Sequence, residues 1–482
     1  MDSSTDTARS GAVEVDSEGY SKSLGNRQVQ MIAMGGAIGV GLFLLAGGRL
    51  QTTGPALVLS YAACGIAAFF VMRALGELVL YRQTSGSFVT YAREFIGPWA
   101  GFVSGWMYWL NWAMTGVAEI TAIGIYVHRW LPHSPEWLTS LVALVALIAI
   151  NLLSVKLFGE LEFWFAVIKV LAIVVFLFVG IALVITATNI NGHPAGVANL
   201  TANGGFFPHG VGVPLIALQS VVFAYSAIEL VGIAAGETKN PLKVLPRAIS
   251  SVIYRIGIFY VGSVLLLAML LPSNLYNPLV SPFVTVFGAL GVPGIADVMN
   301  LVVLTAALSS ANSGLYSTGR VLRSLADKRE APEFVGRMSA RHVPYGGILF
   351  TSVVYVAGVL LNQWKGAQEA FEIATAVASL GVIVTWAALV YSQMQLRKAA
   401  LRGEVERPSF RMPGAPWTGW LTLGFLALVV VMMAFAGGAE QIAFFTIPGI
   451  VVVLFLGWRL VKARRPVAPE ITGRVRLPVS ED

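Results

Sequence analysis

The chain has 482 residues, of which 56% are hydrophobic and only 12% charged, whereas soluble domains carry about 25% charged residues. This composition excludes an ordinary soluble protein, and the net charge of +7 has to be explained by where the basic residues lie. The single cysteine, Cys64, excludes an internal disulfide framework and a thiolate-bound metal cluster.

Twelve apolar runs follow a polar amino-terminal segment, and each is close to the roughly 20 residues needed to cross a bilayer. The eighth run has a second interpretation, because Asp297 lies at its outer end and residues 281–294 could form an external re-entrant or surface helix. The predicted spans are 28–48, 54–72, 95–118, 138–155, 163–188, 212–236, 256–271, 295–319, 345–361, 371–393, 417–437 and 442–460.

The basic residues predict the orientation of these spans. If the amino terminus is inside, all but four of the 32 lysines and arginines are cytoplasmic; Arg49, Arg129 and Lys365 lie near external ends, and Lys169 lies within a span. This bias is the positive-inside pattern of a multi-pass membrane protein. It places both termini in the cytoplasm, with tails over 1–24 and 463–482, and it argues against nucleic acid as a partner.

The first span contains a glycine cluster in the run MGGAIGVGLF, with Gly35, Gly36, Gly39 and Gly41. A helix broken at this depth is tolerated where protein or a water-filled cavity satisfies the backbone, and its free N–H groups can then bind a carboxylate or an ion. The same glycines could equally mark a close contact between two intact helices.

The sixth span carries Glu229 in the run FAYSAIELVGIAAGE, together with Gly232 and Gly236. A carboxylate inside the membrane is costly and is usually functional, although Glu229 could also cap an unwound segment without touching substrate. Interrupted spans one and six, each opening a block of five, are typical of inverted-repeat transporters that bind substrate near the membrane midplane.

Lys169 lies about two turns inside the fifth span, in EFWFAVIKVLAIVV, with no neighbouring acid predicted in its own helix. It could reach an interface by snorkelling, or it could be a buried amine that carries protons or replaces a bound sodium ion. The eighth span offers polar partners in Ser309, Ser310, Asn312 and Ser313. Serines in membrane helices also commonly bond only to their own helix.

The third span adds Asn111, Thr115 and Glu119. Glu119 is the third ionisable residue predicted at membrane depth, after Lys169 and Glu229. Recognition of a substrate side chain would explain its position, and so would a structural salt bridge or hydrogen bond. No histidine pair with metal-ligand spacing and no GxxxxGK[ST] phosphate loop occurs in the chain, so the sequence favours neither a metalloenzyme nor an ATPase.

These features resemble those of bacterial amino acid permeases of the amino acid-polyamine-organocation superfamily. The resemblance extends from about residue 25 to about residue 462. It is carried by the stretches MIAMGGAIGVGLF, RALGELVLYRQTSGSFVTYAREFIGPWAGFVSGWMYW, GELEFWFAVIKVLAIV, NGGFFPHG, VVFAYSAIELVGIAAGETKNPLKVLPRAI and VVLTAALSSANSGLYSTGRVLRSLA.

The resemblance implies an all-α polytopic fold of about twelve transmembrane helices, with two inverted five-helix repeats and helices one and six broken. The permease domain would span 25–462, with repeats over about 28–190 and 210–395 and two further helices over about 417–461. It also implies alternating-access uptake of an amino acid with protons, without enzymatic activity or an organic cofactor, in the bacterial inner membrane. The sequence predicts no oligomeric state.

The resemblance also implies roles for individual residues. Amides around Gly36, Gly39 and Gly41 would bind the substrate carboxylate, and carbonyls around Phe223, Ala224 and Ser226 would bind its ammonium group. Thr115 and Glu119 would line the site, while Lys169, Glu229, Ser309 and Ser310 would serve proton coupling. L-asparagine is the favoured substrate, with D-serine, D-alanine, glycine, glutamine or GABA, or exchange in place of symport, as alternatives. We expect Asp in asparagine transporters where this chain has Glu119.

Overall fold

The computed structural model describes residues 38–82, 87–153, 155–230, 246, 249–250, 253–254, 256–340 and 343–464. The predicted tail over 1–24, Gly35 and Gly36 of the first span, and Gly232 and Gly236 of the sixth lie outside the described residues, as does most of the tail predicted from residue 463.

Helices account for nearly all of the regular structure. The α-helices are α2 (Val40–Phe43), α3 (Leu45–Thr53), α4 (Leu57–Tyr81), α5 (Ser87–Phe95), α6 (Pro98–His128), α7 (Glu136–Leu153), α8 (Val155–Ile185), α9 (Val213–Ile216), α10 (Leu218–Ala224), α13 (Ser263–Leu270), α14 (Pro282–Gly288), α15 (Ile295–Asp327), α16 (Tyr345–Lys365), α17 (Ala367–Leu401), α18 (Trp417–Met433) and α19 (Gly438–Arg464). Short 3-10 turns occupy η1 (Val197–Leu200), η3 (Ser273–Leu275) and η4 (Glu333–Gly336), η2 (Ile256–Gly262) is π-helical, and β1 (Asn189–Ile190) pairs antiparallel with β2 (His193–Pro194).

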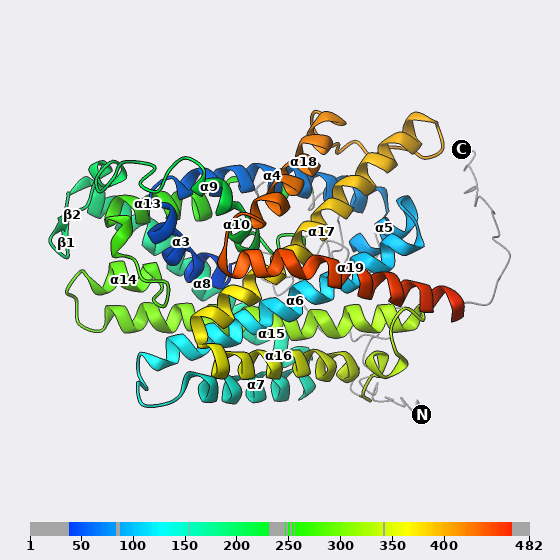
Figure 1. Ribbon diagram of the computed structural model, residues 1–482, viewed down its shortest axis with the longest axis horizontal. Coiled ribbons are helices and arrows are strands. Elements are labelled where there is room, and N and C mark those ends of the chain that lie inside the picture. Colours follow the sequence, from blue (N-terminus) through cyan, green and yellow to red (C-terminus); the bar gives the residue numbers. More distant parts are fainter. Residues whose placement is uncertain are drawn as a thin grey trace, which may run out of the picture.

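Eight of the described helices are long and apolar enough to cross a membrane: α4, α6, α7, α8, α15, α16, α17 and α19. Two shorter apolar segments, Ile256–Leu270 and α18, lie at the predicted seventh and eleventh spans. The pairs α2 and α3, and α9 and α10, lie at the first and sixth. Most of the long helices run along the long axis of the molecule (Figure 1). The predicted all-α polytopic fold is confirmed.

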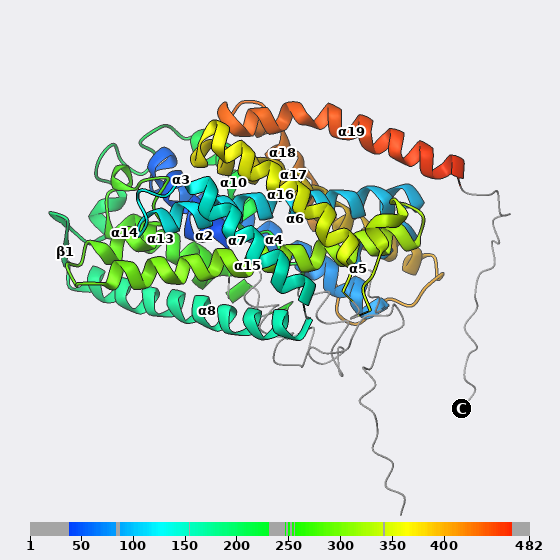
Figure 2. The same cartoon turned by 90° about the horizontal axis from the view of Figure 1, so that it is seen from below.

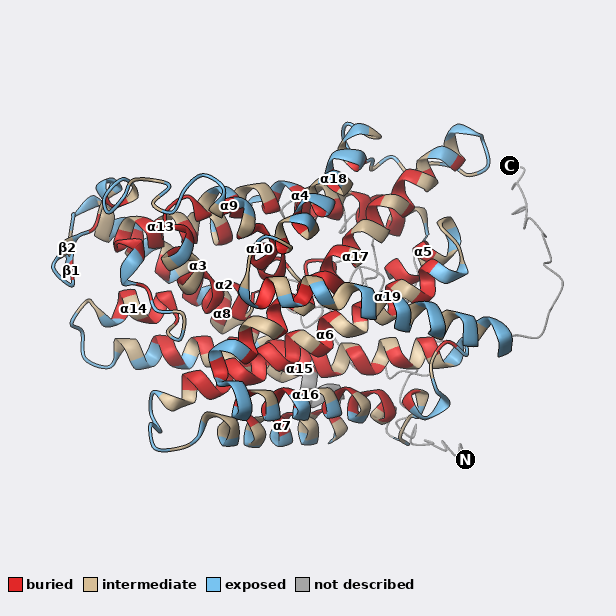
Figure 3. Ribbon diagram, in the orientation of Figure 1, coloured by how far each residue is buried: buried red, intermediate tan, exposed pale blue. Residues whose placement is uncertain are grey.

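The bundle is centred on α6, which packs against α15 and α17 and has 83% of its apolar stretch buried. Seen from below, α19 and α8 lie on opposite outer faces (Figure 2). Burial is concentrated in the middle of the bundle, and α7 and α19 present exposed faces (Figure 3). These exposed faces carry large apolar side chains such as Val142 and Phe445, as expected where helices contact lipid rather than water.

The eighth span is one continuous helix. Helix α15 runs from Ile295 to Asp327, and Asp297 in its first turn accepts a hydrogen bond of 2.7 Å from Nε of Arg129 at the end of α6. The stretch 281–294 contains the separate short helix α14. Most residues of α14 are buried, so this helix packs into the protein, and the eighth span is formed by α15.

Buried ion pairs join segments at the end of the bundle that holds α5 and the carboxy-terminal part of α19 (Figure 1). Arg93 of α5 makes two hydrogen bonds of 2.5 and 2.7 Å to the Glu330 carboxylate, which follows α15 and whose side chain is fully buried. Glu77 of α4 accepts hydrogen bonds from Nε of Arg407 at 2.5 Å and the backbone N–H of Met412 at 2.8 Å. These bonds anchor loops to the helical core.

Candidate functional site

The first span is interrupted where the sequence placed its glycines. Gly39 has an extended backbone (φ −133°, ψ −159°), α2 begins only at Val40, and Leu44 (φ −122°, ψ −54°) separates α2 from α3. Gly36, predicted to offer an amide to substrate, lies outside the described residues. Within the described residues, the backbone N–H of Gly41 makes no hydrogen bond, whereas that of Val40 points to Glu119.

The sixth span is interrupted after α10. Regular helix ends at Ala224, and Ala227 has a positive φ of 69°, a strained conformation for a residue with a side chain. The Phe223 carbonyl accepts a hydrogen bond of 2.9 Å from the N–H of Ser226. The carbonyls of Ala224 and Ser226 accept none from the part of the chain that the structure describes.

The two interrupted helices touch each other directly. A Cβ atom added to Gly41 of α2 would lie 2.6 Å from the Cα of Ala224 in α10, so only glycine permits this approach. Nearby, the Tyr225 hydroxyl donates a 2.9 Å hydrogen bond to the Tyr61 carbonyl. The packing therefore places the interrupted part of the first span against that of the sixth.

Glu119 of α6 lies against the start of α2. Its Oε1 atom accepts a long hydrogen bond of 3.4 Å from the N–H of Val40, and a Cβ at Gly39 would lie 2.8 Å from that oxygen. The same Cβ would lie 3.3 Å from the hydroxyl of Ser310. One turn before Glu119, buried Thr115 donates to the side chain of Asn111 at 3.3 Å. The other Glu119 oxygen has no hydrogen-bond partner among the described residues.

Lys169 is fully buried, so its side chain does not snorkel to an interface. Its Nζ atom donates a hydrogen bond of 2.9 Å to the Ser309 hydroxyl, and that hydroxyl donates one of 2.7 Å to Oε1 of Glu162. The expectation that Lys169 has no acidic neighbour in its own helix is therefore wrong. Glu162 precedes it by seven residues, which is two helical turns and hence the same face, so the spacing alone could have revealed it.

Glu229 lies apart from this lysine. It is buried in the irregular stretch after α10, beside Tyr108 of α6 and Trp386 of α17, and its Oε2 atom has no hydrogen-bond partner within the described chain. Of the predicted coupling residues, the structure thus brings Lys169, Ser309 and Ser310 together with Glu119 and places Glu229 at a different part of the core.

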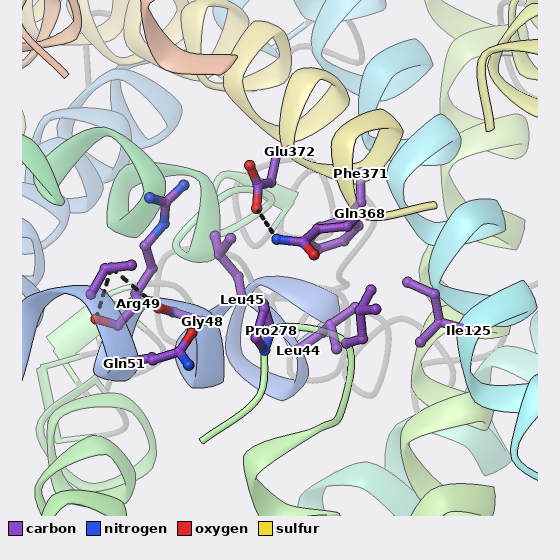
Figure 4. A pocket seen from close by; sticks show the side chains of 12 residues that line it. Leu44, Leu45, Gly48, Arg49, Gln51, Ile125, Pro278, Gln368, Phe371 and Glu372 are labelled. Atoms are coloured by element: carbon purple, nitrogen blue, oxygen red, sulfur yellow. Dashed lines mark hydrogen bonds between the residues drawn. The ribbon is translucent and has the colours of Figure 1, made fainter. Parts of the chain in front are cut away.

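A pocket lies beside the first interrupted span, between α3, the end of α6, the start of α17 and the loop that contains Pro278 (Figure 4). Polar side chains line it, among them Arg49, Gln368 and Glu372, and Gln368 donates a 3.1 Å hydrogen bond to Glu372. Arg49 pairs with Glu440 at the start of α19. Leu44 and Leu45, where α2 meets α3, form part of its wall.

The membrane-length helices surround two interrupted helices, and buried polar groups lie where those two helices meet. This arrangement is that of a multi-pass membrane transporter. A family model described as amino acid permease matches residues 28–470. The chain belongs to the amino acid permease family, and it is a transporter rather than an enzyme. Among the described residues no group of three or more His, Cys, Asp or Glu side chains could hold a metal ion.

Curated relatives agree over almost the whole chain. It is 56% identical to the L-asparagine permease of Salmonella typhimurium and 55% identical to that of Escherichia coli, in each case over 93% of this chain and 90% of the relative. It is 53% identical to the L-asparagine permease of Streptomyces coelicolor, over 92% of this chain and 91% of the relative.

Proposed function

We propose that this permease imports L-asparagine across the bacterial inner membrane by proton symport. The substrate follows from the relatives, each named an L-asparagine permease and more than 50% identical over nine-tenths of the chain. The proton is the only coupling ion required, and no organic cofactor takes part. Both termini are assigned to the cytoplasm, because the lysines and arginines are concentrated in the loops on that side.

The substrate binds where α2 and α10 meet. Its carboxylate is held by backbone N–H groups of the glycine segment, at Gly36, Gly39 and Gly41, and its ammonium group by the carbonyls of Ala224 and Ser226. Phe223 supports the binding less directly, because its carbonyl already accepts the N–H of Ser226. Unpaired backbone groups beside a broken helix supply such contacts without charged side chains.

We assign recognition of the carboxamide in the asparagine side chain to α6. Thr115 and Glu119 are one turn apart and so lie on one helix face, and Glu119 reaches the start of α2. A carboxamide has one acceptor and two donor hydrogens, which suits a site with a hydroxyl and a carboxyl group. The unpartnered Glu119 oxygen is the group available to receive an amide hydrogen.

Proton coupling is assigned to Lys169, and its complete burial beside Ser309 is the observation that carries the mechanism. A buried lysine amine is stable only beside polar or charged partners, so the gain or loss of one proton at Lys169 changes how strongly α8 and α15 bind each other.

Further groups extend this region. Ser310 connects it to Glu119, and Glu229 supplies a second acidic group beside the interrupted sixth span. Opening of the pocket beside Arg49 provides the external access route.

The test is uptake of labelled L-asparagine into proteoliposomes with an imposed inward proton gradient, with and without an uncoupler. We expect gradient-driven accumulation that the uncoupler abolishes and that unlabelled glutamine, D-serine, glycine and GABA compete poorly. Asparagine uptake that is equal with and without the proton gradient would contradict symport.

A permease for another small neutral amino acid, or an exchanger, is the second candidate. Glu119 favours it, because its side chain is one methylene longer than the Asp expected in an asparagine transporter, which changes the shape of the proposed substrate site. Strong uptake of one of the competitors without uptake of asparagine would select the different substrate. Uptake that requires internal amino acid would select exchange.

A further inference from the structure

Glu162 is joined to Lys169 by a single bridging hydroxyl. Ser309 of α15 accepts a hydrogen bond from Lys169 Nζ at 2.9 Å and donates one to Glu162 Oε1 at 2.7 Å. All three side chains are completely buried. A carboxyl, a hydroxyl and an amine at these distances form an unbroken path along which a proton can move.

The charges around Lys169 do not balance if every group is ionised. Glu162 and Glu119 both lie close enough to interact with its ammonium group, so two carboxyls face one amine. Two serines of α15, Ser309 and Ser313, also interact with Glu162, and neither carries a charge. A buried excess negative charge is costly, and the cluster therefore favours one additional bound proton.

The position of Glu162 gives that proton a direction. It lies seven residues before Lys169 in α8, so its Cα atom is about 10 Å closer to the start of the helix at 1.5 Å per residue. In the proposed orientation, α8 starts on the cytoplasmic side. The Oε2 atom of Glu162 has no hydrogen-bond partner among the described residues, so this oxygen is available to a further partner.

We propose that Glu162 accepts the transported proton from Lys169 and releases it toward the cytoplasm, an inference that rests on the proposed function of proton symport. The Lys169 ammonium gives a proton to the Ser309 oxygen while the hydroxyl proton of Ser309 moves to Oε1 of Glu162. The products are a neutral amine, an intact hydroxyl and a neutral carboxylic acid. Loss of the proton from Glu162 to the inside resets the carboxylate.

The experiment compares Glu162→Gln with Glu160→Gln in proteoliposomes. Glutamine keeps an acceptor for Ser309 but cannot take up a proton. Glu160, two residues earlier, accepts a hydrogen bond from exposed Trp164 at 3.2 Å, so its substitution removes the same charge outside the path. For each variant, pH-driven accumulation and asparagine-for-asparagine exchange are measured over a range of internal pH.

We expect E162Q to lower pH-driven accumulation by at least about tenfold, to lose its dependence on internal pH, and to retain exchange, which needs no net proton release. E160Q should match the wild type in both assays. Glu162→Asp should recover part of the accumulation, because it restores a titratable carboxyl. Wild-type accumulation by E162Q would overturn the proposal.

A second outcome would also overturn the proposal. If E162Q and E162D both lose exchange as well as accumulation, yet elute from size exclusion like the wild type, Glu162 has a structural role. Failure of symport itself is distinguishable, since wild-type protein would then show no gradient-driven accumulation. Ser309→Ala provides an independent measurement. Removal of the bridging hydroxyl should reproduce the E162Q defect, and Ser309→Thr should restore accumulation.

Discussion

Gly41 and Ala224 hold the two interrupted helices in contact, with only 2.6 Å between the position of a Cβ at Gly41 and the Cα of Ala224. The contact links residues 183 positions apart, at the point where each segment departs from regular helix. This contact keeps the interrupted parts of the two spans side by side. The absence of a side chain at Gly41 is therefore a requirement of the site's geometry.

Gly41→Ala should impair both folding and uptake. The added methyl group meets backbone rather than a flexible side chain, and overpacking of this kind costs about 1–3 kcal/mol. Gly424→Ala in α18 is the matched control, because its added Cβ would meet no other described part of the chain within 4 Å beyond the backbone of its own helix. Thermal unfolding in detergent and asparagine uptake would be measured for both variants, and equal behaviour of the two would contradict the contact.

Lys169→Ala should abolish pH-driven accumulation. The variant leaves Glu119 and Glu162 in the core without their cation, so both are expected to remain protonated and the cycle of proton binding and release stops. Lys365→Ala is the control, since Lys365 is exposed and pairs with Glu369 at 3.1 Å. Uptake is measured against external pH; a Lys169→Ala profile like that of the wild type would remove Lys169 from coupling.

Arg93→Ala should destabilise the protein strongly. It removes the arginine that pairs with the buried Glu330 carboxylate, and removing one partner of a buried ion pair costs about 3–5 kcal/mol. Arg82→Ala breaks the more exposed pair with Glu94, and such pairs contribute about 0–1 kcal/mol. Denaturant titration in detergent, followed by tryptophan fluorescence, compares the two variants. Similar losses in both would show that the burial of Glu330 has no energetic consequence.

Single-cysteine labelling should establish the orientation of the chain. Cys64 is the only cysteine and is completely buried, so an impermeant maleimide should leave the parent protein unmodified. Leu279→Cys, in the loop beside the pocket, should be labelled from outside intact cells. Arg402→Cys, after α17, should be labelled only when the cytoplasmic side is opened. The reverse pattern would invert the proposed topology.

The sequence by itself predicted the all-α polytopic fold and placed an apolar run at each of the eight membrane-length helices that the structure describes, because a bilayer imposes a local requirement of length and hydropathy on each segment. It also located the irregular backbone of the first span, since glycines at membrane depth remove the side chains that stabilise helix packing. Lys169 and Glu119 were recognisable from the sequence as well, because a charged residue stands out in an apolar run.

Only the tertiary structure decided which of these groups meet. The bond between Ser309 and Glu162 joins residues 147 positions apart, and the separation of Glu229 from Lys169 depends on how α10 and α8 pack against α6, α15 and α17. Hydropathy and periodicity describe one helix at a time, whereas a polar cluster in the core is formed by the rotation and register of several helices against one another. The proposed role of Glu162 rests on that packing.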